Sequence, residues 1–151
     1  MTRLVTIAAL VTALGCSSDP PTAPSPSPGS YSGAWSGTAT DPDNGSGTLH
    51  LELTELTVDS NRSLLGGTWR AEFPTGGRVA AGSVAGLRSG RSVQLTLQPS
   101  TPLPCPPGPF AAGGGTYSAT DLTASDATIA GPYTYQTCDG SVPGALTVRR
   151  Q

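Results

Sequence analysis

Apolar and polar side chains alternate in short runs from residue 31 to the end of the chain. Gly, Pro, Asn and Asp separate these runs, and no run keeps the period of an amphipathic helix. Because successive side chains of a strand point to opposite faces, the alternation predicts strands with one buried and one solvated face. We predict eight strands, at residues 31–39, 47–58, 63–73, 78–88, 91–99, 115–123, 126–136 and 143–150.

The second of these strands interrupts the pattern. Leu49, Leu51 and Leu53 share one face, but the next position on that face is Glu55, and Leu56 lies on the opposite face. One extra residue in the strand would return the apolar side chains to the first face. We therefore expect a β-bulge after Leu53.

A Gly-x-aromatic sequence recurs on four of the predicted strands. Glycine two positions before a large ring leaves room on the same face and permits the bending that barrel closure requires. Consecutive antiparallel strands can close into an up-and-down barrel or divide into two packed sheets. We predict an all-β domain, a single eight-stranded antiparallel meander closed into a small barrel, with a β-sandwich as the alternative. The four sequences are Gly33-Ala34-Trp35, Gly67-Thr68-Trp69, Gly115-Thr116-Tyr117 and Gly131-Pro132-Tyr133.

Two families of β-barrels have similar motifs. Gly33-Ala34-Trp35 together with Arg149 resembles the lipocalin arrangement, in which Gly-x-Trp opens the first strand and a late Arg packs across the Trp at the closed end. The repeated Gly-Thr-aromatic sequences are similar to those of avidin-type barrels. The resemblance covers residues 31–151 loosely and implies the architecture only. The helix that follows the strands in lipocalins has no counterpart here, and the biotin-binding residues of avidins cannot be placed in this sequence.

Five aromatic residues and Arg149 are the candidate residues of the barrel interior or its closed end. The rings either fill the core or line a small apolar cavity, since an eight-stranded barrel can hold one small ligand. Aromatic residues make up only 5% of the chain, which favours a filled interior. The five rings are those of Trp35, Trp69, Tyr117, Tyr133 and Tyr135.

The first 15 residues have the layout of a signal peptide. Arg3 precedes an uncharged run of 11 residues, which is shorter than the roughly 20 that a membrane-spanning helix needs. Thr12-Ala13-Leu14-Gly15-Cys16 resembles the lipobox of bacterial lipoproteins, with Ala13 where that family most often has Leu. An ordinary secretory signal, cleaved nearby, is the alternative.

The lipobox resemblance implies that the leader is cleaved before Cys16 and that Cys16 is acylated. Ser17 in the next position is similar to outer-membrane sorting in that family. Residues 17–30 contain five prolines and almost no hydrophobic side chain, so they cannot bury enough surface to offset the entropy of ordering. The chain therefore divides into a signal peptide at 1–15, a lipidated, Pro/Ser-rich disordered tether at 16–30 and a β-barrel domain at 31–151.

Two cysteines, Cys105 and Cys138, remain once Cys16 is assigned to the anchor. In a chain exported to an oxidising compartment, both are expected to join in a disulfide. A metal site would need four ligands, and only His50 could join the two cysteines. A redox-active pair would more typically have the C-x-x-C spacing, which is absent.

Catalytic and cofactor-binding patterns are absent from the sequence. The single His, His50, alternates with leucines and is expected on the outer face of the sheet. Residues 41–45 resemble a calcium loop, but their spacing misses the EF-hand pattern by one residue, which favours a hairpin turn. A net charge of −2 with eight scattered arginines gives no reason to expect nucleic acid. We predict no enzymatic activity, no cofactor and no metal.

These features predict a bacterial lipoprotein, held by its N-terminal lipid in the cell envelope at the outer membrane. The barrel is expected to bind a small apolar ligand or a protein partner. The long connection at 99–114 could cover the barrel mouth or meet that partner. The alternative is a structural or adhesion-type β-sandwich lipoprotein of the cell surface. In a closed barrel the first strand pairs with the last, whereas in a sandwich it need not.

Overall fold

The computed structural model describes residues 29–75, 77–102, 105 and 115–151. Its eight strands begin and end within two residues of the predicted ones. The described residues contain no helix long and apolar enough to cross a membrane. The strands are β1 (Gly33–Asp41), β2 (Gly45–Thr57), β3 (Arg62–Phe73), β4 (Arg78–Ser89), β5 (Ser92–Pro99), β6 (Tyr117–Ser125), β7 (Thr128–Gln136) and β8 (Ser141–Arg150).

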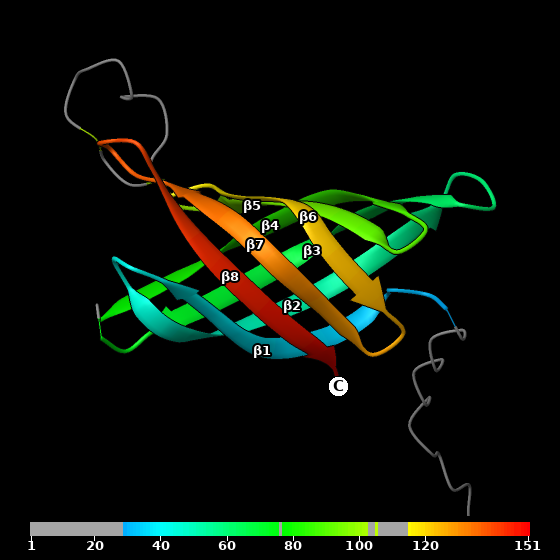
Figure 1. The fold of residues 1–151 in the computed structure, drawn as a ribbon, viewed down its shortest axis with the longest axis horizontal. Coiled ribbons are helices and arrows are strands. Elements are labelled where there is room, and N and C mark those ends of the chain that lie inside the picture. The colour runs from blue at the N-terminus through cyan, green and yellow to red at the C-terminus, as the bar shows by residue number, and fades with distance from the viewer. Residues whose placement is uncertain (1–28, 76, 103–104, 106–114) are drawn as a thin grey trace, which may run out of the picture.

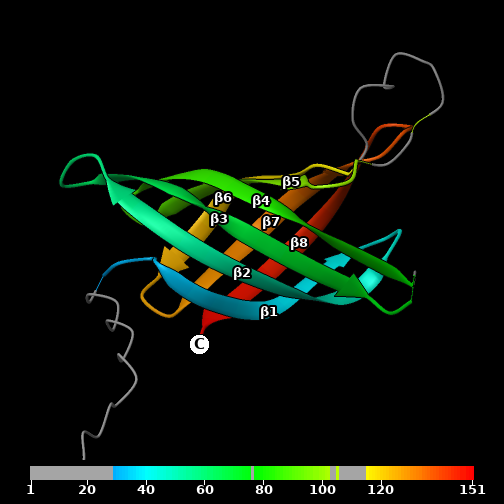
Figure 2. The same ribbon diagram turned by 180° about the vertical axis from the view of Figure 1, so that it is seen from behind.

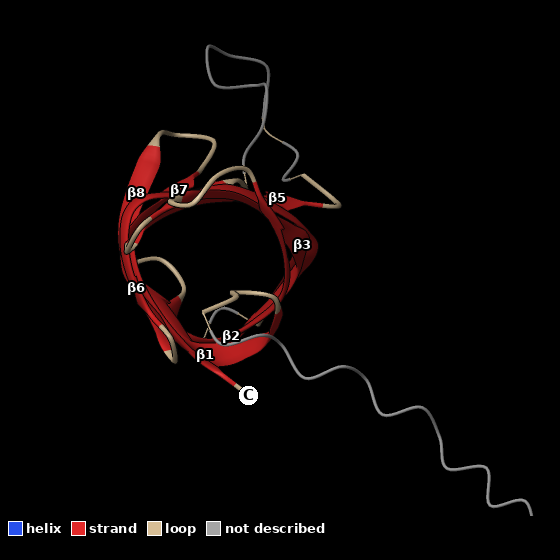
Figure 3. Ribbon diagram, turned by 90° about the vertical axis from the view of Figure 1, so that its right-hand side faces the viewer, coloured by secondary structure: helices blue, strands red, loops and turns tan. Residues whose placement is uncertain are grey.

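The strands form a closed barrel (Figure 1 and Figure 3). Each strand pairs antiparallel with the next one in the chain. β8 also pairs antiparallel with β1, where Trp35 lies opposite Arg150 and Thr40 lies opposite Ala145. This last pairing confirms the predicted eight-stranded barrel and excludes the β-sandwich.

The hydrophobic core lies inside the barrel. In β2, Leu49, Leu51 and Leu53 point inward, whereas His50 and Glu52 between them are exposed. Removing the inward apolar side chains from water supplies the main driving force for folding. The largest fully buried side chains include those of Trp35, Tyr135, Phe73, Leu51, Leu95, Leu122 and Ile129.

β2 contains no bulge, so that prediction is wrong. Its pairing with β3 is regular from Thr48 to Thr57, and Leu56 stays exposed on the outer face. Glu55 keeps the inward position because an arginine meets it there, as described below. The strand therefore stays regular and carries a charged residue at an inward position, where a bulge was expected.

The bulge lies in β6. The pairing of β6 with β5 and with β7 shifts by one residue along the strand. Thr120 and Asp121 are both exposed there, so the inward positions change from Ala119 to Leu122. The spacing of three between these two apolar residues is the trace that the bulge leaves in the sequence.

The glycines of the four Gly-x-aromatic sequences share a backbone conformation. Their φ angles are positive, between 111° and 152°, a region that residues with a Cβ atom rarely adopt. At Gly67 a Cβ atom would also lie 1.9 Å from the carbonyl oxygen of Glu52 on β2. The motif therefore marks a backbone conformation that favours glycine and, at Gly67, also a close approach of the neighbouring strand.

The two ends of the barrel carry different connections (Figure 1 and Figure 2). One end, which we call the terminal end, holds Gly29, Gln151 and the β2–β3, β4–β5 and β6–β7 hairpins. The other, which we call the disulfide end, holds the β1–β2, β3–β4 and β7–β8 connections and both cysteines of the domain. The polar chemistry of the interior is concentrated at these two ends.

Candidate functional site

Four of the five predicted aromatic residues form one cluster toward the disulfide end. The ring centroid of Tyr117 lies 4.7 Å from that of Tyr135, 5.6 Å from that of Tyr133 and 5.3 Å from that of Trp69. All four side chains are buried. Rings at these separations pack as in a solid protein core. The cluster therefore fills this part of the barrel.

Little space remains beside the cluster. The cavity there has a volume of about 10 Å³, which is room for about one water molecule. The Tyr117 hydroxyl group is buried without a hydrogen-bond partner among the described residues, and burial raises the pKa of Tyr117 to about 12. The lining residues include Ala39, Leu49, Phe73, Leu97 and Leu146. The described interior is thus too full for an apolar ligand.

The turn between β1 and β2 anchors this end through a buried carboxylate. Asp41 is only 3% exposed, and its Oδ1 accepts hydrogen bonds from the backbone N–H groups of Asp43 at 3.0 Å and Asn44 at 2.7 Å. The Asn44 side-chain amide donates to both carboxylate oxygens, at 2.9 and 3.0 Å. The hydroxyl group of Tyr133 donates to Oδ2 of Asp41 at 2.9 Å.

Residues 41–45 are therefore a hairpin turn whose carboxylate is already occupied by hydrogen-bond donors. A calcium ion would need those same oxygen atoms. No cluster of three or more His, Cys, Asp or Glu residues that could hold a metal ion occurs within the part of the chain that the structure describes. Burial, together with the hydrogen bond to Asp41 and its negative charge, raises the pKa of Tyr133 far above its ordinary value.

The terminal end of the interior is closed by a stack of side chains. The ring of Tyr31 lies parallel to that of Trp35, with centroids 5.7 Å apart, and the Trp35 indole N–H donates to the carbonyl oxygen of Tyr31 at 3.0 Å. The guanidinium group of Arg150 lies 5.1 Å from the Trp35 ring. It also donates to the carbonyl oxygen of Ser30.

The arginine that covers Trp35 is thus Arg150, and the prediction of Arg149 is wrong. In β8 the inward positions are those of Leu146, Val148 and Arg150, so Arg149 points to the outer face and is exposed. The predicted type of contact, an arginine across the Trp35 ring, is present, but the arginine is one residue later in the chain. The strict alternation of β8 carried the signal that distinguishes the two arginines.

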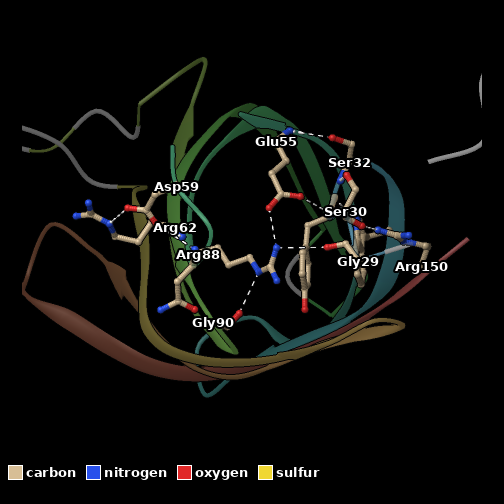
Figure 4. A network of polar contacts seen from close by, with 12 residues as sticks. Gly29, Ser30, Ser32, Glu55, Asp59, Arg62, Arg88, Gly90 and Arg150 are labelled. Atoms are coloured by element: carbon tan, nitrogen blue, oxygen red, sulfur yellow. Dashed lines mark hydrogen bonds and ion pairs between the residues drawn. The ribbon is translucent and has the colours of Figure 1, made fainter. Parts of the chain in front are cut away.

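An ion pair that the sequence analysis missed lies beside this stack (Figure 4). The Arg88 guanidinium group donates to Oε1 of Glu55 at 2.9 Å, and the Glu55 side chain is only 5% exposed. The backbone N–H group of Tyr31 donates to Oε2 of Glu55 at 2.6 Å. Arg88 also lies 4.5 Å from the Tyr31 ring and donates to the carbonyl oxygen of Gly90 at 3.0 Å.

The surroundings of Glu55 favour its charged form. Burial by itself raises the pKa of this carboxyl group, but hydrogen bonds from Tyr31, Ser63 and Arg88 outweigh burial and lower the pKa below its ordinary value. Glu55 and Arg88 are 33 residues apart in the sequence. The one local signal was that Glu55 takes an inward position in the alternation of β2.

The predicted disulfide is confirmed. Cys105 and Cys138 are bonded, with their Cα atoms 5.2 Å apart. Cys138 lies in the β7–β8 connection and Cys105 in the β5–β6 connection, so the bond joins two connections at the same end of the barrel. Most of the predicted loop at 99–114, like the predicted signal peptide, Cys16 and nearly all of the tether, lies outside the described residues.

The remaining chemical candidate, His50, lies on the outer face of β2, as expected. It is exposed, and its pairing partners are Ser36 on β1 and Arg70 on β3. The hollows of the described surface are open and partly polar. A groove of about 450 Å³ at the terminal end is lined by Glu55, Arg88, Asn61, Arg62 and neighbouring residues.

The chain was also compared with known proteins. It matches no model of a known protein family, and the comparison with curated proteins shows no significant match.

Proposed function

We propose that this protein is a bacterial lipoprotein, anchored to the outer membrane by acylated Cys16, whose barrel is a non-enzymatic module that binds a protein partner with its outer surface. The observation that carries the choice of a partner over an enclosed ligand is the filled interior, with its cavity of about 10 Å³. A carrier of small apolar molecules needs an apolar pocket of several hundred Å³, whereas the groove of about 450 Å³ at the terminal end is lined mostly by polar and charged residues.

The anchoring part of the proposal is supported by the lipobox and by the composition of residues 17–30. Several acyl chains on one residue hold a protein durably on a bilayer, because each buried CH₂ group contributes about 0.8 kcal/mol. Gly29, the first described residue, lies only thirteen positions after Cys16, so the barrel follows the anchor after a short segment.

The non-enzymatic part is supported by how the polar groups of the interior are used. The carboxylates of Asp41 and Glu55 are each held by several donors, and the lone His50 is on the outer face of β2. Groups held in this way close the two ends of a rigid scaffold. Neither carboxylate is therefore free to act as a general base or a nucleophile.

Native mass spectrometry of the protein purified from its own envelope tests the choice between partner and ligand. We expect the mass of the polypeptide with its covalent acyl groups, alone or with a protein partner, and no bound small molecule that leaves on mild activation. A small apolar molecule, present in stoichiometric amount and released when the barrel unfolds, would contradict the proposal.

Metabolic labelling with a radioactive fatty acid tests the anchor. The parent chain is expected to carry the label and to fractionate with the outer membrane, and Cys16→Ala is expected to lose both properties. Cys105→Ser with Cys138→Ser is the matched control, because it removes two cysteines and leaves the lipobox intact. Equal labelling of the Cys16→Ala chain would refute acylation at this residue.

A further inference from the structure

The outer face of the barrel carries a row of exposed apolar side chains at the terminal end. Leu56 on β2 pairs with Leu64 on β3, and Leu64 pairs with Leu87 on β4, so the three lie side by side across the sheet. Their exposed fractions are 67%, 48% and 37%. Val58, 55% exposed, continues the row into the β2–β3 hairpin. We call these four residues the apolar row.

The apolar row differs from the rest of the outer face, which is mostly polar or charged. Farther along the outer face of β2 and β3, the outward positions carry His50, Glu52, Arg70 and Glu72. Val79, at the disulfide end of β4, is the other large hydrophobic residue that is exposed in the described part of the chain. A contiguous exposed apolar group on a small domain marks a surface that meets an apolar environment.

Charged side chains are distributed unequally along the barrel. The terminal end has five arginines and three carboxylates, namely Arg62, Arg88, Arg91, Arg149 and Arg150 against Glu55, Asp59 and Asp126. The rest of the described chain has two arginines and six carboxylates, namely Arg70 and Arg78 against Asp41, Asp43, Glu52, Glu72, Asp121 and Asp139. The apolar row therefore lies at the positive end of a polarised molecule.

The arginines next to the apolar row are accessible. Arg62 is 60% exposed and pairs with the exposed Asp59 in the β2–β3 hairpin (Figure 4). Arg91 is exposed in the neighbouring β4–β5 hairpin, and its side chain has no ion-pair partner among the described residues. Exposed arginines beside apolar side chains are the combination that binds an anionic lipid surface.

We propose that the terminal end of the barrel docks on the anionic phospholipid surface of the membrane, with the apolar row inserted among the headgroups. This inference rests on the proposed acylation of Cys16 for its orientation. Gly29 lies at the same end, where its carbonyl oxygen accepts a hydrogen bond from Arg88 at 3.3 Å. The thirteen residues back to Cys16 can span at most about 45 Å. An anchor at Cys16 thus keeps this end near the bilayer at an effective concentration in the millimolar range.

The charge pattern favours the membrane over a second copy of the chain. A symmetric dimer through the apolar row would bring together the positive ends of two copies, each carrying Arg62 and Arg91. An anionic surface meets both arginines with charge of opposite sign. Four side chains also make a small patch, well below the roughly 800 Å² per partner of a stable protein interface.

Docking in this way sets the orientation of the barrel. The β2–β4 side of the terminal end faces the lipid, and the disulfide end, with its excess of carboxylates, points away from it. The partner of the proposed function then meets the disulfide end or the β6–β8 side of the barrel.

Quenching of a surface tryptophan by brominated lipids measures the docking in the full-length acylated protein. Leu64→Trp places a reporter in the apolar row, and Val79→Trp is the matched control at the opposite end of the barrel. The two native tryptophans are 1% and 3% exposed and give a constant background. In vesicles of phosphatidylglycerol and brominated phosphatidylcholine, we expect the Leu64→Trp signal to fall about twofold or more relative to the control. Equal quenching of the two variants would overturn the proposal.

Flotation of the unacylated chain without its leader, residues 17–151, separates docking from anchoring, because a Cys16→Ala chain would keep the apolar leader and bind vesicles through it. We expect binding to phosphatidylglycerol vesicles that weakens at high salt and is lost in Leu56→Ser with Leu64→Ser and Leu87→Ser, while Val79→Ser binds as before. Unchanged thermal unfolding would show that these exposed substitutions preserve the fold. If Cys16 carries no fatty-acid label but the chain binds vesicles through the apolar row, the proposed acylation is wrong and the proposed docking is supported. Labelling without vesicle binding, or a concentration-dependent dimer that the serine variant abolishes, refutes docking.

Discussion

Individual polar residues at the two ends of the barrel decide how its interior is closed. Asp41 and Glu55 are carboxylates that the fold buries, and each is matched by donors from distant strands, Tyr133 to Asp41 and Arg88 to Glu55. A buried charge is tolerable only when it is paired and hydrogen-bonded. Removing a donor from either carboxylate should therefore lower the free energy of unfolding by more than the small loss of buried area would predict.

The hydroxyl groups of two neighbouring tyrosines provide a matched pair for this argument. Tyr133→Phe removes a donor from the buried Asp41 carboxylate and is expected to lower the free energy of unfolding by about 1–3 kcal/mol. Tyr117→Phe removes a buried hydroxyl group that has no partner among the described residues, so it should leave stability unchanged or raise it. Urea denaturation of both variants checks the difference, and equal losses would contradict it.

Glu55 makes stability depend on pH. Because the folded-state pKa of Glu55 lies below its ordinary value of 4.5, its contribution is complete above pH 4.5 and is lost as the pH falls through the lowered pKa. Glu55→Gln should lower the free energy of unfolding by about 1–2 kcal/mol at pH 7. The gap between parent and variant should close in acid. Glu52→Gln, on the outer face of the same strand, is the control, and an equal effect there would rule out the ion pair as the cause.

At the scale of single strands, the geometry of closure depends on glycine. Each Gly-x-aromatic sequence places its glycine at a positive φ angle, and at Gly67 the backbone of β2 lies where a side chain would begin. The adjacent Gly66 has only ordinary contacts around a Cβ position, the nearest atom being 3.5 Å away on Thr54. Two neighbouring glycines of the same strand thus have unequal roles.

Alanine at these two positions should separate the roles. Gly67→Ala combines an unfavourable φ angle with a direct clash against Glu52, and it is expected to cost at least about 3 kcal/mol or to prevent folding. Gly66→Ala should change stability by less than about 1 kcal/mol. Circular dichroism during thermal unfolding would measure both, and similar melting temperatures for the two variants would contradict the role assigned to Gly67.

Strand alternation made most of this fold predictable, because the period of two is local and the turn residues mark where it stops. Alternation did not predict the structure where the backbone has a bulge or where a buried residue is paired with a distant strand. The β6 bulge is visible in the sequence only as a spacing of three between Ala119 and Leu122. Glu55 interrupts the alternation of β2 because its partner, Arg88, lies on another strand. The parity of β8, and not the family motif, identifies Arg150 as the residue that contacts Trp35.

At the scale of the whole molecule, hydrogen bonds close the barrel at one place and the disulfide links the chain at another. The β1–β8 pairing joins strands from the two ends of the domain, and the disulfide joins two connections at one end of the barrel. The disulfide closes a chain segment of 34 residues, from Cys105 to Cys138. Its main effect is expected on the unfolded chain, whose freedom it restricts.

Replacing both cysteines measures that effect. Cys105→Ser with Cys138→Ser is expected to lower the free energy of unfolding by about 4 kcal/mol, the chain-entropy value for a segment of this length. The barrel should still form, because all eight strand pairings are independent of the bond. Guanidinium denaturation under oxidising conditions would test this, and a fall of less than about 1 kcal/mol would refute the estimate.

The pairing of β1 with β8 also determines when the barrel can form. Trp35 and Arg150 are opposite each other although 115 positions separate them, so the ring stays open until the last strand is available. An incomplete chain would present two strand edges with unpaired backbone groups, which promote aggregation. Contacts between such distant segments also form slowly. If the chain is exported unfolded, as the proposed lipoprotein function requires, the late β1–β8 pairing would postpone folding until residue 150 has left the export channel.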